Sequence, residues 1–285
     1  MKLEVIIPVY KPGNDFGKLI EKLKEQELKP ELITILLTTD SASEVEEYQH
    51  KYGEGVRVIG IPKIRFSHGG TRQAGMDMSD AEYVLFMTQD AMPVDKELTI
   101  RLYEALHKPD AAVAYARQIP KADADDIEKF SRRFNYPKVS HTQAAIDLEK
   151  KGIKAIFCSD ACAMYNHKLH DELGGFDIDA NFNEDSIFAY EALTGGYTVE
   201  YCAEAKVYHS HNLTYKQHFI RNRNIARAQK EHASIYGSLK SEHEGIRYFL
   251  TGSRYFNTKK QYKNSLKLFW TCVVRFFGYK AGKLF

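Results

Sequence analysis

Apolar residues in the first third of the chain gather in short continuous runs, separated by longer segments of mixed polarity. Such runs are typical of strands that are buried on both faces of a sheet. They cover residues 3–9, 32–37, 56–61 and 83–87. The segments with the length and pattern of helices are residues 15–27, 43–52, 69–78 and 95–106. Strands that alternate with helices in this way predict an α/β fold with a parallel, doubly wound sheet.

The second half of the chain has a less regular pattern. Strands are expected at residues 111–118, 153–158, 198–202 and 206–208. Helices are expected at residues 123–136, 184–193 and 215–236, and again after residue 245. In the last of these, apolar residues recur at three- and four-residue steps, which indicates a helix with one apolar face. They are Leu266, Phe269, Trp270, Val273 and Phe277.

The composition is that of an ordinary globular protein and excludes a disordered chain. Of 285 residues, 44% are hydrophobic and 27% are charged. No stretch reaches the roughly 18 apolar residues of a membrane-spanning helix, and Lys2 leads directly into a strand instead of a signal peptide. The four cysteines have no zinc-ligand spacing. We therefore expect reduced thiols and a cytoplasmic location.

Charge is distributed unevenly along the chain. Residues 245–285 contain nine Lys/Arg and no Asp/Glu, which leaves 31 basic and 38 acidic residues in the remainder. A basic tail with many aromatic residues is suited to an anionic membrane surface. The same apolar face is equally suited to packing on the rest of the protein or to a dimer interface. The acidic body and the lack of a nucleic-acid-binding motif exclude a nucleic-acid partner.

Two groups of residues have the chemistry of a metal site. Asp90 follows the apolar run at residues 83–87, where a lone carboxylate can bind a divalent cation that bridges phosphates. His209 and His211 follow a short strand, and imidazole is a common metal ligand. The alternatives are that Asp90 is a cap or turn residue and that the two histidines form a structural pair.

Two further segments have the chemistry of a catalytic or anion-binding site. Glu184 and Asp185 stand at an expected helix start, where either carboxylate suits the helix dipole and one can act as a general base. The segment His68-Gly69-Gly70-Thr71-Arg72 combines glycines before a helix with an arginine, a pattern that favours binding of an anion. The dinucleotide fingerprint GxGxxG and the P-loop are both absent, which argues against dehydrogenases and kinases.

As a set, these motifs resemble family 2 glycosyltransferases of the glycosyltransferase A fold, over about residues 3–215. The matching segments are Val5-Ile6-Ile7-Pro8-Val9-Tyr10, Thr39-Asp40-Ser41-Ala42-Ser43, His68 to Gly75, Thr88-Gln89-Asp90-Ala91, and Gly174-Gly175-Phe176-Asp177 ahead of Glu184-Asp185. Details are similar to the rhamnosyltransferase subgroup. They are residues 66–72, the Thr-Gln-Asp form of the metal motif, residues 207–212 and residues 275–280.

The resemblance implies a Rossmann-like, mostly parallel sheet flanked by helices, with a helical C-terminal extension. It divides the chain into a catalytic nucleotide-sugar-binding domain at residues 1–240 and a basic aromatic extension at residues 241–285. It implies that Asp185 is the catalytic base and that Asp90 holds Mg²⁺ or Mn²⁺, with His209, more than His211, as a second ligand. The residues that it assigns to substrate binding are Pro8, Val9, Tyr10, Asp40, Ser41, His68, Arg72, Gln89 and Glu184. Among these, Arg72 is expected to face the nucleotide or the diphosphate.

The resemblance also implies the reaction. An inverting, metal-dependent transferase would move L-rhamnose from dTDP-L-rhamnose to a saccharide or lipid-linked saccharide in surface polysaccharide synthesis, in contact with the inner membrane face. Two residues depart from the family pattern: Ala42 replaces a glycine, and Thr88 replaces the first Asp of Asp-x-Asp. Another donor of the UDP-hexose type and a non-catalytic nucleotide-sugar-binding module remain alternatives. Oligomerisation through the C-terminal helices also remains open.

Overall fold

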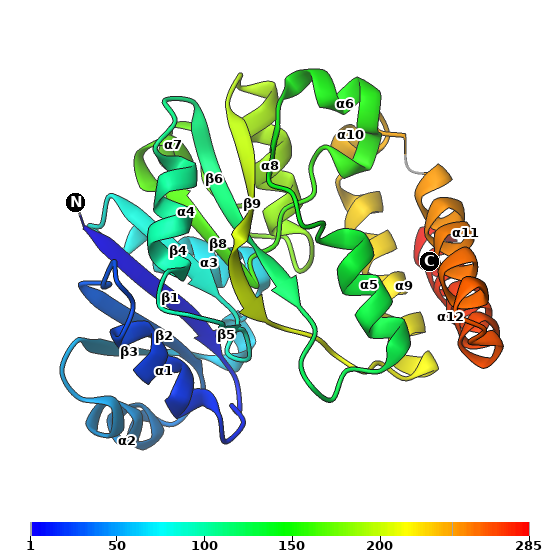
Figure 1. Ribbon diagram of the computed structural model, residues 1–285. Coiled ribbons are helices and arrows are strands. Elements are labelled where there is room, and N and C mark those ends of the chain that lie inside the picture. Colours follow the sequence, from blue (N-terminus) through cyan, green and yellow to red (C-terminus); the bar gives the residue numbers. More distant parts are fainter. Residues whose placement is uncertain (1, 241, 285) are drawn as a thin grey trace. The chain divides into compact units, whose positions relative to one another are not determined.

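The computed structural model describes residues 2–240 and 242–284 (Figure 1). The chain forms two compact units. The first contains residues 1–118, 138–145 and 156–209, and the second contains residues 119–137, 146–155 and 210–285. The units do not follow the predicted boundary at residue 240, because helices from the middle of the chain pack with the C-terminal helices.

In the described part of the chain, nine strands form one sheet in the first unit. Their spatial order is β3-β2-β1-β4-β8-β6-β9-β5, and β7 pairs with β9. Their bounds are β1 Leu3–Val9, β2 Leu32–Thr38, β3 Val56–Ile61, β4 Tyr83–Met87, β5 Met92–Pro93, β6 Ala111–Ile119, β7 His141–Gln143, β8 Cys162–Asn166 and β9 Thr198–Tyr208.

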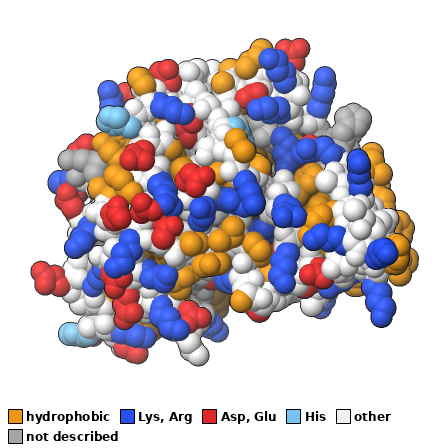
Figure 2. Space-filling model, viewed as in Figure 1, with side chains coloured by type: hydrophobic (Ala, Val, Ile, Leu, Met, Phe, Trp, Pro, Cys, Tyr) orange, Lys and Arg blue, Asp and Glu red, His pale blue; other side chains and the backbone are white. Residues whose placement is uncertain are grey.

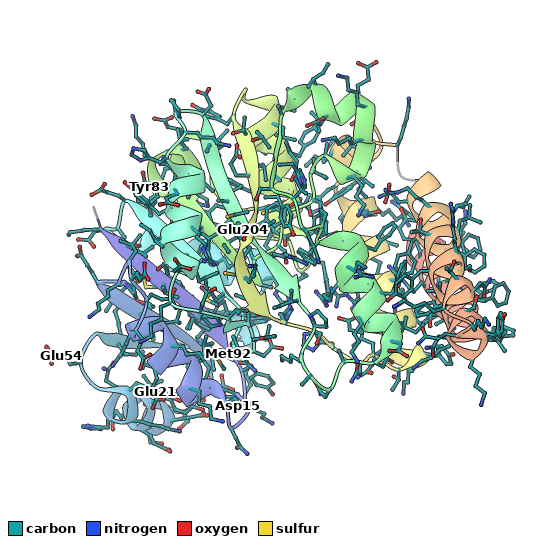
Figure 3. The ribbon with its side chains drawn as sticks, in the orientation of Figure 1. Asp15, Glu21, Glu54, Tyr83, Met92 and Glu204 are labelled. Atoms are coloured by element: carbon teal, nitrogen blue, oxygen red, sulfur yellow. The ribbon has the colours of Figure 1, made fainter. Side chains whose placement is uncertain are left out.

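The predicted α/β fold is confirmed, but the sheet is mixed instead of mostly parallel. β1, β2, β3 and β4 are parallel neighbours, whereas β8 runs antiparallel to both β4 and β6. β9 runs antiparallel to the short strands β5 and β7, and Met92 of β5, labelled in Figure 3, lies opposite Tyr208. The strand expected at residues 153–158 does not form. A 3₁₀ turn at Gly152–Lys154 stands at its beginning, and the chain enters the sheet only at β8.

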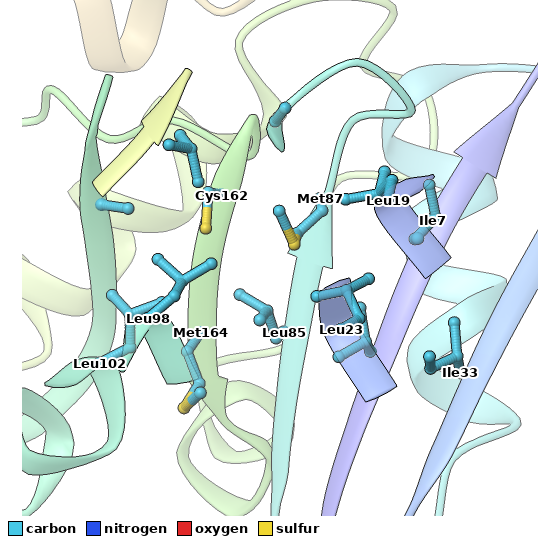
Figure 4. Close-up of a cluster of buried hydrophobic side chains, with 14 of the residues drawn as sticks. Ile7, Leu19, Leu23, Ile33, Leu85, Met87, Leu98, Leu102, Cys162 and Met164 are labelled. Carbon is cyan, nitrogen blue, oxygen red and sulfur yellow. The ribbon is translucent and has the colours of Figure 1, made fainter. Parts of the chain in front are cut away.

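Helices flank this sheet and bury their apolar faces against it. They are α1 Phe16–Lys24, α2 Ala42–Tyr52, α3 His68–Asp77, α4 Leu98–Leu106, α7 His167–Glu172 and α8 Glu184–Thr194. Figure 4 shows how Leu19 and Leu23 of α1 pack beside Ile7, Ile33 and Leu85 of the sheet. All five are almost fully buried. Burial of such a side chain stabilises the fold by about 1.5–3 kcal/mol, and the close-packed core holds the strand ends in fixed positions.

The second unit is helical in its described residues. Its helices are α5 Asp126–Asn135, α6 Ala145–Lys151, α9 Tyr215–Glu231, α10 Ala233–Tyr236, α11 Glu242–Thr258 and α12 Tyr262–Leu284. The predicted helical C-terminal extension is therefore confirmed. α12 packs closely on α9 at Gly278 and Gly282. A side chain at these positions would collide with the backbone carbonyls of Phe219 and Arg223, so glycine allows the close approach. A search of the described residues finds no helix that is long and apolar enough to cross a membrane.

Candidate active site

Three parallel strands bring their carboxyl ends to one edge of the sheet. Val9 at the end of β1 lies opposite Leu37 of β2, and Phe86 of β4 follows the same register. The residues that come directly after these strands, among them Tyr10 and Asp40, therefore share that edge. In open α/β sheets this is the edge where ligands bind.

The antiparallel strand β8 begins where β4 ends. The backbone N–H of Thr88, just after β4, donates to the carbonyl oxygen of Ala161, just before β8, at 3.3 Å. Asp90 and Asp160 are the next acidic residues beyond this contact, one on each strand extension. The antiparallel pairing therefore adds residues from the second half of the first unit to the same edge.

Gln89 joins the loop after β1 to the loop after β4. Its side-chain amide accepts a hydrogen bond from the Tyr10 N–H at 2.8 Å and donates one to the Tyr10 carbonyl at 3.1 Å. Tyr10 exposes 48% of its surface, whereas Val9 is buried in the strand and Pro8 is half-buried. The residues predicted to line the nucleobase site are thus the end of β1 and the exposed aromatic ring that follows it.

Asp40 and Ser41 follow β2 and have protein partners. The Asp40 carboxylate accepts from the Lys63 N–H at 3.1 Å and lies 3.2 Å from the Lys63 ammonium. These contacts lower the pKa of Asp40 below its ordinary value, with the backbone hydrogen bond as the largest cause. The Ser41 hydroxyl caps α2 by accepting from the Glu44 N–H. Both residues are exposed at the sheet edge.

Asp90 and His209 face one another across this edge. The His209 Nε2 lies 3.4 Å from an Asp90 carboxylate oxygen, and its Nδ1 lies 2.8 Å from Gln118 Oε1. The Gln118 amide nitrogen donates to the Ser159 hydroxyl at 2.8 Å, so its oxygen must accept from Nδ1–H. With Nδ1 bound to Gln118, Nε2 is the ring nitrogen on the Asp90 side, the arrangement found in histidines that bind a metal through Nε2. His211 is exposed and belongs to the second unit.

Asp185 stands in the first turn of α8, next to a strained residue. Asn183 has left-handed backbone angles, φ 65° and ψ 22°. One Asp185 carboxylate oxygen accepts from the Ser186 N–H at 2.7 Å, and the other accepts from the Asp160 N–H at 3.3 Å. Burial is the largest cause that raises the Asp185 pKa to about 8, followed by repulsion from Glu184 and Asp160. A carboxyl with this pKa is a strong base once it is ionised, which happens as the pH approaches and passes about 8.

Arg72 is buried beside Asp185, with only 4% of its surface exposed. Its Nε lies 2.9 Å from Asp160 Oδ2, and its Nη1 lies 2.7 Å from Glu184 Oε1. The Tyr165 hydroxyl donates to the other Asp160 oxygen at 2.5 Å. The expected contact between Arg72 and a diphosphate stays a prediction, and in this structure the guanidinium is engaged by two carboxylates.

The glycines of the His68 segment have a different role from the one suggested by their sequence. His68 begins α3, its ring packs against Phe182, and burial lowers its pKa. The Gly69 N–H donates to the Ala180 carbonyl at 2.9 Å, and a Cβ at this position would lie 1.8 Å from the Asp177 carbonyl oxygen. These contacts contradict the anion-cradle interpretation, because the glycine backbone is already packed against protein.

Sequence reasoning missed Gln118, Ser159, Asp160 and Tyr165. Only Asp160 gave a usable signal, since it is the sole acidic residue in the otherwise apolar segment 155–164. A charge in such a segment is stable only when it is paired. The other three are neutral residues whose function depends on a partner elsewhere in the chain.

Two curated relatives come from Salmonella. The O-antigen chain rhamnosyltransferase RfbN of Salmonella typhimurium is 34% identical over 223 residues, which cover 78% of this chain and 70% of the relative. The O-antigen chain rhamnosyltransferase WbaN of Salmonella anatum is 30% identical over 219 residues, which cover 76% and 69%.

Solved structures share the fold at much lower identity. The mannosyltransferase PcManGT from Pyrobaculum calidifontis, in complex with GDP-Man and Mn²⁺, matches with a TM-score of 0.66 at 12% identity. The match covers 98% of this chain and 87% of that one. Residues 1–349 of S. aureus TarS match with a TM-score of 0.54 at 14% identity and cover 100% and 90%. The model of the family described as "Glycosyl transferase family 2" matches residues 4–174. With two curated relatives at 30% identity or more and this match over most of the chain, the protein belongs to glycosyltransferase family 2.

Proposed function

We propose that this glycosyltransferase moves L-rhamnose from dTDP-L-rhamnose to a hydroxyl group of a saccharide acceptor, with inversion, during synthesis of a surface polysaccharide. The names of both Salmonella relatives support the sugar and the class of polymer. The observation that supports the chemistry is the position of the Asp185 carboxyl. One of its oxygens accepts from the Asp160 N–H, beside the sheet edge that bears Asp90 and His209.

Asp185 takes the proton of the acceptor hydroxyl in this proposal. The oxygen then forms a bond to the anomeric carbon, while the bond from that carbon to the diphosphate oxygen breaks. The nucleoside diphosphate leaves with the electron pair. Attack on the face opposite the leaving group inverts the anomeric centre. Proton transfer by a positioned side chain of this kind contributes about 10²–10⁴-fold in rate.

Asp90 and His209 fit a divalent cation. Their carboxylate oxygen and imidazole nitrogen face one another at 3.4 Å, and the contact of Gln118 with Nδ1 orients the ring so that Nε2 faces Asp90. His211, two residues further along the chain, is a third candidate ligand. Mn²⁺ accepts an imidazole ligand more readily than Mg²⁺, which favours oxygen. The cation supplies Lewis-acid stabilisation of the charge on the leaving diphosphate.

The donor's nucleoside has a candidate site at the ends of β1 and β2. Pro8, Val9 and Tyr10 form the floor and the aromatic wall, and Asp40 and Ser41 lie beside them as polar groups for the base edge. The ion pair between Asp40 and Lys63 keeps that carboxylate ionised, so it can accept hydrogen bonds. In the same proposal, Gln89 positions Tyr10 through its two hydrogen bonds, and His68 lies at the start of α3, where its ring packs against Phe182.

Thermal shift with a panel of nucleotide sugars tests the donor and the cation together. A ligand that binds only the native state raises its melting temperature. We expect the largest shift with dTDP-L-rhamnose plus Mn²⁺, a smaller shift in EDTA, and release of dTDP when a saccharide acceptor is added. A larger shift with UDP-hexoses would support the alternative donor class. Binding without any release of nucleoside diphosphate would support a non-catalytic binding module.

We also propose that the C-terminal helices contact the anionic inner face of the membrane. α11 and α12 carry exposed apolar side chains, visible among basic ones in Figure 2, and Leu266 and Trp270 expose 60% and 50% of their surfaces. The exposed set is Ile246, Leu250, Tyr262, Leu266, Phe269, Trp270, Phe276 and Phe277. Exposed basic residues on the same helices or the turn between them are Arg254, Lys259, Lys260, Lys263 and Lys280. Apolar burial and attraction of about 1 kcal/mol per cation act together at such a surface.

Replacing Leu266 and Trp270 with serine should abolish cosedimentation with anionic liposomes at low salt and leave donor hydrolysis intact. The control replaces Ile64 and Val139, which are exposed apolar residues of the first unit, with serine and should retain liposome binding. The membrane proposal fails if the unmutated protein ignores the liposomes. It also fails if the tail variant instead loses a dimer in analytical ultracentrifugation, which would assign the face to oligomerisation.

A further inference from the structure

We propose that Arg72, Asp160 and Glu184 form a buried ionic clamp that positions the base Asp185, and that Arg72 does not contact the donor. This inference rests on the proposed function. It assigns a positioning role to Arg72 and Glu184, which the family resemblance places in substrate binding, and to Asp160, which the resemblance does not mention. We call these three residues the Arg72 clamp.

The clamp joins three segments that are far apart in the sequence. Arg72 lies in α3, Asp160 precedes β8, and Glu184 is the first residue of α8. Its two ion pairs measure 2.9 Å and 2.7 Å, and all three side chains are less than one-tenth exposed. Removing one partner would leave a buried charge uncompensated, so the cluster strongly favours one arrangement of the three segments.

Asp185 is connected to this cluster on two sides. The Asp160 N–H donates to one of its carboxylate oxygens at 3.3 Å, and Glu184 is its neighbour in the first turn of α8. Any shift of the α8 start relative to β8 would therefore change the position of the base. Asn183, in the left-handed region just before the helix, adds a sharp turn that must be held in place.

Further contacts fix α3 to the segment that leads into α8. The Ser67 hydroxyl donates to the Ile178 carbonyl at 3.0 Å, and the Phe176 N–H donates to Gln73 Oε1 at 2.7 Å. Together with the close approach at Gly69, these bonds make α3 a rigid support. Through its two ion pairs, Arg72 thus ties α3 to Asp160 ahead of β8 and to Glu184 at the start of α8.

Asp185 has two acidic neighbours and one basic neighbour in the clamp. A change in the clamp should therefore alter the pH dependence of kcat. Burial raises the Asp185 pKa most, the carboxylates Glu184 and Asp160 raise it further, and the Arg72 cation lowers it. Cys158 and Tyr165, also close by, are held neutral by burial. His68 faces the same cluster through Glu184 and is kept neutral by burial. A change of the Arg72 guanidinium should therefore alter both the pKa and the position of the Asp185 carboxyl.

The variant Arg72→Lys tests the clamp, because lysine keeps the charge but cannot reach two carboxylates as a planar fork. We expect kcat to fall about 10–100-fold, the pH dependence of kcat to shift, and the dissociation constant for dTDP in Mn²⁺ to stay within about twofold. The matched control is Arg57→Lys, since Arg57 pairs with the buried Glu4 at 2.8 Å, outside the candidate site. It should leave kcat and its pH profile unchanged.

Opposite results would overturn the proposal. If Arg72→Lys weakens dTDP binding more than tenfold while kcat at saturating donor stays normal, Arg72 is a donor contact. If the variant does not fold by circular dichroism, Tyr165→Phe decides, because it removes only the hydrogen bond to Asp160. That variant should lower kcat with unchanged dTDP affinity, and an unchanged kcat and pH profile would refute the clamp. A fully active Asp185→Asn protein would instead refute the proposed base, which is a different outcome.

Discussion

Replacing Asp185 with asparagine should lower kcat by about 10²–10⁴-fold, the range that removal of a general base produces. Asparagine keeps the shape of the side chain, and its single amide oxygen can accept from either the Ser186 N–H or the Asp160 N–H, but not both. We expect it to keep the shorter bond to Ser186 and with it the start of α8. The affinity for dTDP should not change, because the base acts on the acceptor. Stopped assays of acceptor glycosylation and calorimetry with dTDP measure the two quantities separately.

Asp179→Asn is a suitable control, since Asp179 is an exposed acidic residue ahead of α8. It should transfer sugar at the normal rate. Near-normal turnover of Asp185→Asn would remove Asp185 from the mechanism. Glu184 would then be the next carboxylate in sequence, although its side chain is buried against Arg72.

The raised pKa of Asp185 gives this prediction a pH signature. In the ligand-free enzyme the carboxyl remains protonated up to about pH 8, so kcat/KM should rise with pH towards that value. The asparagine variant should lack this rise. Stability should have the opposite slope. Between about pH 4 and 8 the folded state retains a proton that the unfolded state has lost, so the native protein loses stability across this range and no further above it. Thermal melts should show a shallower loss for Asp185→Asn.

Replacing Asp90 with alanine should weaken dTDP binding about 10–100-fold in Mn²⁺ and leave it unchanged in EDTA. Asp90 is the acidic member of the candidate metal pair, and a divalent cation depends on such an oxygen ligand. The diphosphate would then lose the cation that bridges it to the protein. Isothermal calorimetry with dTDP under both conditions measures the difference.

His209→Ala should give a milder form of the same defect, and Gln118→Ala should also weaken cation-dependent binding because it removes the group that orients the ring. Lys121→Ala, in the segment after β6, is a control that leaves all three side chains intact. Equal dTDP affinity of the unmutated protein in EDTA and in Mn²⁺ would contradict the metal assignment altogether.

The first half of the fold could be predicted from the sequence almost element by element. The expected strands at residues 3–9, 32–37, 56–61 and 83–87 correspond to β1 to β4 within one residue at each end. These strands are buried on both faces, so their apolar runs are continuous and are bounded by polar or glycine-containing segments. A continuous apolar run was a sufficient signal for these four strands.

The second half required tertiary information. β5 and β7 are two and three residues long, and strands of this length have no recognisable period. The apolar segment at residues 153–158 suggested a strand but contributes a buried turn instead, and β9 runs without a break through the two short strands expected there. Whether a short apolar run becomes a strand depends on whether a neighbouring edge is free to pair with it.

In the candidate site, too, the sequence indicated some of the residues, and only the tertiary structure showed their partners. Asp90, Asp185 and His209 could be selected from the sequence, because a polar residue next to the end of an apolar run marks the ligand edge of a sheet, and because the motifs resemble one family. The partners of Arg72 could not, since Asp160 precedes β8 and Glu184 begins α8, and both meet Arg72 of α3 only in the folded chain. Gln118 of β6 meets His209 because β6 and β9, which ends just before His209, are neighbours in the sheet. The sequence by itself therefore determined the fold family and the chemical groups, since both depend on local patterns of burial and residue type. The tertiary structure alone decided which charges are paired and which remain available to substrate, because ion pairing depends on distances that no local pattern encodes.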